Sequence, residues 1–218
     1  MSDYLTDDEQ VAALRKWWDE NGTQLVVTLV LVVGGVIGWR WWVDYHQVRT
    51  EAASALYQQF LEARGAEAVR NDESDLAAIV EQLDDEFAGT SYQTFTLLYR
   101  AHDAVEAEKY AEAADLLHRV IDGAPDDLLK DLARTRIARV LAQQGEYDAA
   151  LTELSNVRGE GYRALAAETK GDILVARGDA ADQAAEAYRS ALAETPAGEA
   201  EAILEAKLAD VTRADATP

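Results

Sequence analysis

Cysteine and histidine, which supply many nucleophiles and metal ligands, are absent or few in this 218-residue chain. There is no Cys, which excludes thiolate catalysis, disulfides and zinc or iron–sulfur sites with Cys ligands. The three histidines, His46, His102 and His118, lie far apart in the sequence and form no His-Glu-x-x-His motif. We therefore expect no metal site and no cofactor.

One short motif nominally fits a dinucleotide-binding fingerprint, since residues 159–164 read GEGYRA. That fingerprint must follow a strand and open a helix, whereas the preceding LTELSNV has a helical pattern, so we expect a turn between repeats. The acidic pairs Asp84/Asp85 and Asp126/Asp127 could in principle do acid–base work, but solvated faces and helix starts explain them more simply. We predict no catalytic residues and no enzymatic activity.

The charge balance excludes another class of function. The chain has 41 Asp and Glu against 20 Lys and Arg, a formal net charge of −21. Such a chain repels nucleic acid, because phosphate binding needs Lys and Arg. Apolar residues make up 49% of the chain, enough for a folded core rather than an acidic disordered tail. The excess acidity favours basic clients or a high-salt setting.

An uncharged stretch near the N-terminus predicts a membrane span. Residues 21–39 read NGTQLVVTLVLVVGGVIGW, long enough to cover about 28 Å as a helix. A buried core helix and a cleaved signal peptide are the alternatives. Core helices are usually shorter and carry polar residues on one face, and no small-x-small cleavage site follows. Tryptophans lie at both ends, as expected at membrane interfaces: Trp17, Trp18, Trp39, Trp41 and Trp42. We therefore predict an uncleaved signal anchor.

The flanking positive charges do not determine the orientation of the span in the membrane, since Arg15 and Lys16 precede it while Arg40 and Arg49 follow it. Ahead of the span, TDDE at residues 6–9 reads as a capping box, followed by apolar residues on one helical face. This pattern fits an amphipathic helix on the membrane surface, or else a frayed tail.

Within the span, Gly34 and Gly38 form a G-x-x-x-G motif. Small residues four positions apart let a second helix approach closely in lipid. We predict a transmembrane helix contact at this pair, with the alternative that Gly is simply common in membrane helices.

The remainder of the chain reads at the helical period and predicts an all-α protein. A tetratricopeptide-like spacing occurs three times, with small residues where paired helices cross and large residues between hairpins. The three sets are Leu97, Ala101, Tyr110, Ala113 and Leu117; Ala138, Leu141, Tyr147, Ala150 and Leu154; and Gly171, Leu174, Ala184, Tyr188 and Ala191. Gly145 and Gly178 are expected to close the first helix of their pairs. A non-repetitive helical bundle is the alternative.

Such an array forms a curved groove that binds peptides or partner segments without catalysis. The candidate groove aromatics are Tyr99, Tyr110, Tyr147 and Tyr162. For each of them the alternative is packing between hairpins.

Three stretches resemble the YfgM family of ancillary SecYEG translocon subunits. They are residues 9–22 (EQV through WW to ENG), residues 37–40 (IGWR) and residues 132–171, which contain LAR, IARV, GEGY and a final Gly. The resemblance covers nearly the whole chain. It implies a single transmembrane helix in the bacterial inner membrane, with a cytoplasmic N-terminus and a periplasmic tetratricopeptide-like domain.

With that orientation, we expect a cytoplasmic tail with an amphipathic helix in residues 1–20 and a transmembrane signal anchor in residues 21–42. A degenerate helical hairpin would follow in residues 43–90, and tetratricopeptide-like repeats in residues 91–218.

The resemblance also implies partners: the SecYEG translocon, a PpiD-type periplasmic chaperone, emerging polypeptides, the lipid bilayer and, through the N-terminal tail, a cytoplasmic stress-response regulator. The expected role is a non-enzymatic adaptor that helps pass newly translocated polypeptides to periplasmic chaperones. A membrane-anchored scaffold for another envelope complex is the alternative.

Overall fold

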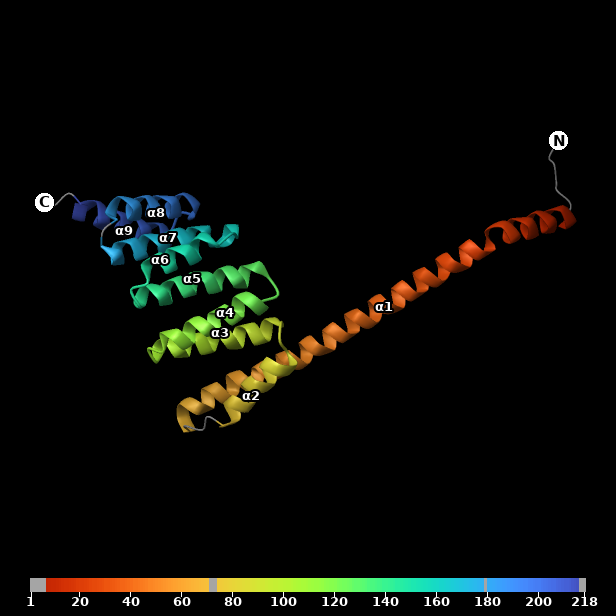
Figure 1. Ribbon diagram of the computed structural model, residues 1–218, viewed down its shortest axis with the longest axis horizontal. Coiled ribbons are helices and arrows are strands. Elements are labelled where there is room, and N and C mark those ends of the chain that lie inside the picture. Colours follow the sequence, from red (N-terminus) through yellow and green to blue (C-terminus); the bar gives the residue numbers. More distant parts are fainter. Residues whose placement is uncertain (1–6, 71–73, 179, 216–218) are drawn as a thin grey trace. The chain divides into compact units, whose positions relative to one another are not determined.

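The computed structural model describes residues 7–70, 74–178 and 180–215, and within these ranges every regular element is a helix (Figure 1). The predicted all-α class is confirmed. The helices are α1 (Asp7–Arg70), α2 (Ser74–Glu86), α3 (Ser91–Glu106), α4 (Tyr110–Gly123), α5 (Asp127–Gln143), α6 (Tyr147–Ser155), α7 (Glu160–Arg177), α8 (Ala181–Glu194) and α9 (Glu199–Asp215). The chain forms two compact units, Met1–Ala52 and Ala53–Pro218.

In the first unit the described residues all belong to α1. Among the described helices, α1 alone is long and apolar enough to cross a membrane. Its apolar side chains are exposed along the uncharged stretch, including Leu29, Leu31 and Ile37. Thr28 donates its hydroxyl to the carbonyl of Gln24 at 2.8 Å, which satisfies this polar group inside the helix, as a lipid environment requires. The first residue of the predicted capping box, Thr6, lies outside the described residues.

The second unit contains three helix pairs, α3/α4, α5/α6 and α7/α8 (Figure 1). Small residues predicted at the helix crossings are buried in shared clusters. Ala101 and Ala113 lie in one cluster, and Ala138 and Ala150 lie in another. Because a Cβ methyl is the largest group at these positions, the backbones of paired helices approach closely. The predicted hairpin repeat is confirmed.

Glycines end the first helices of two pairs, as predicted. Gly145 follows α5 with φ +80° and Gly178 follows α7 with φ +84°, a left-handed conformation that favours glycine. In the α3/α4 pair the non-glycine residue Glu108 takes the left-handed conformation instead, with φ 57°. The repeat therefore tolerates a side chain at this turn.

Buried and capping carboxylates fix the starts of two helices. Asp126 accepts a hydrogen bond from the backbone N–H of Leu129 at 2.9 Å and caps α5, which confirms the predicted helix start. Asp131 is buried and accepts the N–H groups of Arg158 at 3.1 Å and Gly159 at 2.6 Å. Gly159 thus lies in a turn, as predicted, and the side chain of Asp131 anchors that turn, whereas residues 160–164 of the GEGYRA motif form the start of α7 instead of a turn.

For Asp84 the prediction of a solvated face or a helix start is wrong. It lies in α2 and accepts from Gln93 at 3.2 Å, and it forms ion pairs with Arg100 at 3.4 Å and Arg119 at 2.9 Å. Its carboxylate links α2 to α3 and α4, and only 19% of its side chain is exposed. Its neighbour Asp85 is exposed, as expected.

A polar network joins α7, α8 and α9. The buried Tyr188 donates its hydroxyl to Asp172 at 2.8 Å. Lys207 donates to Asp172 at 2.7 Å and to Glu168 at 2.8 Å. Burial, the hydrogen bond to Asp172 and nearby carboxylate charge raise the pKa of Tyr188 well above its ordinary value. Together with the burial of Leu204, these contacts fasten α9 to the last hairpin.

Candidate functional site

A groove with a volume of about 820 Å³ lies in the second unit, mainly between α3 and α5, and we call it the α3–α5 groove. Its lining residues come from α1, α3, α4 and α5: Tyr57, Phe95, Leu98, Tyr99, Ala101, His102, Val105, Tyr110, Leu117, Arg136, Arg139, Val140 and Gln143. This volume falls in the range of sites that hold small molecules or a few side chains of a peptide.

The helical period explains why these residues line one groove. On α3 the lining positions recur every three to four residues from Phe95 to Val105, and on α5 they recur likewise from Arg136 to Gln143. Residues at this spacing share one face of a helix. The two faces are positioned by the start of α3, where the Thr90 hydroxyl accepts the N–H of Gln93 at 3.3 Å, and by the Asp126 cap of α5.

Aromatic rings form one side of the groove. The ring of Tyr57 lies 6.0 Å from that of Phe95, and the ring of Phe60 lies 6.1 Å from that of Tyr99. Burial and the proximity of Tyr99 raise the pKa of Tyr57 above its ordinary value. Arg64 lies over the face of Tyr99 at 5.0 Å and also pairs with Asp103. This wall offers apolar area with hydroxyl groups at its edge.

Arginines form the other side. Arg136 is half-buried and Arg139 is exposed on the same face of α5. Arg139 donates to the hydroxyl of Thr169 at 3.2 Å. Among the described residues, no carboxylate forms an ion pair with either guanidinium. Burial lowers the pKa of Arg136, since desolvation disfavours its charged form.

The four candidate tyrosines have different surroundings. Tyr99 and Tyr110 line the α3–α5 groove. Tyr147 packs against the cluster that contains Ala138 and Ala150. Tyr162 is half-buried near the start of α7, and its phenol acts electrostatically on Arg136 without lining the groove. The structure thus brings two of the four together, and a binding role for any of them stays a prediction.

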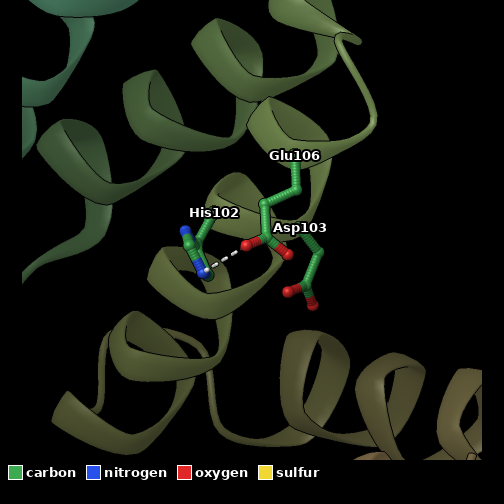
Figure 2. A group of neighbouring side chains, drawn as sticks. All are labelled: His102, Asp103 and Glu106. Carbon is green, nitrogen blue, oxygen red and sulfur yellow. Dashed lines mark ion pairs between the residues drawn. The ribbon is translucent and has the colours of Figure 1, made fainter. Parts of the chain in front are cut away.

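A cluster of three potential metal ligands lies beside the groove on α3 (Figure 2). One ligand atom from each of His102, Asp103 and Glu106 lies within 4.8 Å of the others. Figure 2 shows His102 Nε2 facing Glu106, at 3.4 Å. Asp103 binds Arg64, whose Nε donates to it at 3.1 Å. Because the carboxylates already have cationic or imidazole partners, ion pairing explains this cluster.

The glycine pair of the predicted span lies in the first unit. Apart from its chain neighbours and the helix's own nearby backbone, a Cβ atom added at Gly34 or Gly38 would have no atom of the described residues within 4 Å. The helix itself therefore leaves this face open, and a transmembrane contact at Gly34 and Gly38 stays a prediction.

Sequence reasoning missed several groove residues, chiefly Tyr57, Phe95, Arg136 and Arg139. The signal that could have found the arginines is the spacing on α5, which puts these residues on one helical face: Arg136, Arg139, Val140 and Gln143. Chemically, the groove has no nucleophile–base pair among its lining residues and offers apolar contact beside two cations. Apolar contact area beside cations is suited to ligand binding.

Comparison with known proteins agrees with this architecture. The family described as "Tetratricopeptide repeat-like domain" matches residues 15–213. An "Ancillary SecYEG translocon subunit" of Haemophilus influenzae is 33% identical over 175 residues, which cover 80% of this chain and 83% of that protein. A protein of the same name in Escherichia coli K12 is 32% identical, covering 82% of this chain and 84% of its own length. One in Neisseria gonorrhoeae is 26% identical over 90% of this chain and 92% of its own length.

The match includes both the apolar helix region and the helical hairpins. The chain therefore belongs to the tetratricopeptide-repeat-like family of ancillary SecYEG translocon subunits.

Proposed function

We propose that this protein is a non-enzymatic, membrane-anchored adaptor that associates with a SecYEG translocon and helps pass newly translocated polypeptides to periplasmic chaperones. The observation that carries the proposal is the combination, in one chain, of an apolar helix that could cross a membrane and a repeat domain with an aromatic groove. Relatives of at least 30% identity are named as translocon subunits, which supports the SecYEG association.

In this proposal the anchor acts by raising local concentration. Residues 21–42 cross the inner membrane with the N-terminus in the cytoplasm, and the repeats lie in the periplasm. Tethering beside a channel exit makes capture of an emerging chain an intramolecular event, so that weak groove affinity suffices. A PpiD-type chaperone would take the polypeptide onward, and the N-terminal tail would contact a cytoplasmic stress-response regulator.

The Gly34/Gly38 face is proposed as the contact with a partner helix in the membrane. Lipid tails provide no hydrophobic drive for helix association, so close packing must supply it. The open space around both glycines supports this role, because a neighbouring backbone could approach there without a clash.

Co-purification of the full-length protein in a mild detergent tests the function. We expect channel subunits to be recovered with the wild type. Recovery of a different envelope complex without channel subunits would favour the alternative, a scaffold for assembly of that complex, and would contradict the translocon role.

Matched substitutions test the membrane contact. Gly34→Leu with Gly38→Leu keeps the span apolar, so insertion should survive, but the recovery of partner subunits should fall. The control pair, Val33→Leu with Ile37→Leu, lies on another part of the helix and should change little. Equal recovery with both pairs would mean that the span is only an anchor.

Topology is tested by a fusion after Pro218 of a reporter that is active only in the periplasm. The proposed orientation requires an active reporter, and activity confined to a cytoplasmic reporter would overturn the periplasmic placement.

A further inference from the structure

We propose that the α3–α5 groove binds a segment of a partner polypeptide that presents an Asp or Glu side chain next to an aromatic or aliphatic side chain. This inference rests on the proposed function, in which the groove holds a polypeptide, and it adds the chemistry that the groove selects. It runs against the expectation from net charge, which favours basic clients.

The local charge of the groove is opposite to that of the chain. The protein carries a formal net charge of −21, yet the residues lining the groove include no Asp or Glu in the part of the chain that the structure describes. The cations Arg136 and Arg139 lie on the α5 wall. A ligand in the groove therefore meets positive charge at short range, where direct contacts outweigh the screened field of distant carboxylates.

Most other described arginines of the same unit bind carboxylates, whereas the two groove arginines do not. The pairs are Arg64 with Asp103, Arg100 and Arg119 with Asp84, Arg134 with Asp131, Arg163 with Glu194, and Arg177 with Asp148. Among the described residues of this unit, the other arginines without a carboxylate partner are Arg158 and Arg189, and both are exposed to solvent. Arg136 has no carboxylate partner among the described residues either, but it is partly buried. Burial disfavours the charged form of its guanidinium unless a ligand supplies an anion.

The geometry favours a carboxylate flanked by apolar groups. A guanidinium presents parallel N–H donors that match a carboxylate in two hydrogen bonds. On the opposite side, Phe95 and Tyr99 provide aromatic area for a neighbouring side chain. The lining continues past the arginines to Gln143, which leaves room for chain beyond the carboxylate. This favours an internal acidic side chain over a C-terminal carboxylate.

Peptide binding to the full-length protein in lipid nanodiscs tests the inference. The probe is a fluorescein-labelled nonapeptide with an amidated C-terminus and the central sequence Leu-Phe-Glu-Leu-Phe, measured by fluorescence anisotropy against empty nanodiscs. Comparison peptides replace Glu by Gln or by Lys. A further peptide contains Gln and ends in a free carboxylate. We expect the Glu peptide to bind about tenfold or more tightly than the Gln peptide, and the Lys peptide to bind most weakly.

Paired variants locate the effect. Arg136→Gln with Arg139→Gln should abolish the preference for Glu over Gln while leaving the affinity for the Gln peptide nearly unchanged. The charge-matched control replaces Arg163 and Arg189, both exposed and absent from the groove lining, by Gln. This control should keep the preference. Thermal unfolding provides a second measurement, because Arg136→Gln removes a poorly solvated charge and should leave the melting temperature equal to or above that of the wild type.

Several results would overturn the inference. Equal affinity for the Glu and Gln peptides would do so, as would a Glu preference that survives loss of both groove arginines. No detectable binding of any peptide, or tighter binding of the free-carboxylate peptide than of the Glu peptide, would also contradict it. A melting temperature lowered by Arg136→Gln, but not by Arg189→Gln, would show that Arg136 stabilises the fold instead. None of these outcomes affects the co-purification of channel subunits, so failure here is distinguishable from failure of the proposed function.

Discussion

Gly171 offers a sharp test of how α7 and α8 pack. It lies in α7 and is buried, and a Cβ atom added there would lie 2.5, 2.7 and 2.8 Å from three ring atoms of Tyr188. These distances are well inside van der Waals contact. The ring is poorly placed to yield, because Tyr188 is itself buried and its hydroxyl donates to Asp172 at 2.8 Å.

The expected change in the free energy of unfolding for Gly171→Ala is the difference between two opposing effects. Overpacking a close contact typically costs about 1–3 kcal/mol, and three short contacts to a fixed ring put Gly171→Ala near the upper end. Replacing Gly by Ala within a helix stabilises the helix by about 1 kcal/mol, because Ala has the higher helix propensity. We therefore expect a net loss of about 1–2 kcal/mol in the free energy of unfolding. In a chain of this size, that lowers the melting temperature by roughly 2–8 °C.

The assay is thermal and denaturant unfolding of the full-length protein, with two matched variants. Gly161→Ala lies in the same helix with nothing within 4 Å of the added Cβ, so it should be neutral or slightly stabilising. In a Tyr188→Leu background the clash is relieved, and Gly171→Ala should then cost less than it does in the wild type. A Gly171→Ala protein at least as stable as the wild type would refute the close packing of α7 against Tyr188.

Three further changes probe the same domain. Ala138→Leu should overpack a helix crossing and lower the free energy of unfolding by about 1–3 kcal/mol. The control Glu146→Leu changes an exposed position and should lower it far less. Equal losses in the two variants would mean that the predicted repeat register is wrong. Asp131→Ala should cost about 2–4 kcal/mol in chemical denaturation, because the N–H groups at the start of α7 lose their acceptor, and an unchanged midpoint would contradict that anchoring role. Because the pKa of Tyr188 is raised in the folded protein, its protonated phenol contributes stability that is fully present below the unfolded pKa of 10.0 and is lost as the pH rises toward the folded pKa. The free energy of unfolding should therefore fall above about pH 10. Tyr188→Phe should flatten that decline, and identical slopes for the variant and the wild type would refute the linkage.

Much of the fold follows from local sequence signals. The Asp126 cap, the glycine turn at Gly145 and the small residues at Ala138 and Ala150 each mark a helix end or a helix face, and each lies where the pattern predicts. These features depend on residues within a few positions of one another, or on a repeat of fixed length, so periodicity alone finds them.

The parts that were not predicted depend on contacts between hairpins. Asp131 anchors a turn that lies 27 and 28 residues later, and Asp84 pairs with arginines of two other helices. The groove combines Tyr57 of α1 with Arg136 of α5, and no short window of sequence contains both. Charged residues look alike in an acidic sequence, and only tertiary packing separates a paired arginine from one that faces a groove.

Helix α9 limits where such an array can lengthen by duplication of a hairpin. Leu204 and Val211 are buried in the cluster that includes residues of α8, and Lys207 binds Glu168 and Asp172 of α7. A pair copied from α3/α4 or α5/α6 and inserted after α8 would separate α9 from these partners and uncover apolar surface. An insertion before α7 would keep α7, α8 and α9 together as one inherited block. Gains of repeats copied from α3/α4 or α5/α6 should therefore concentrate upstream of α7.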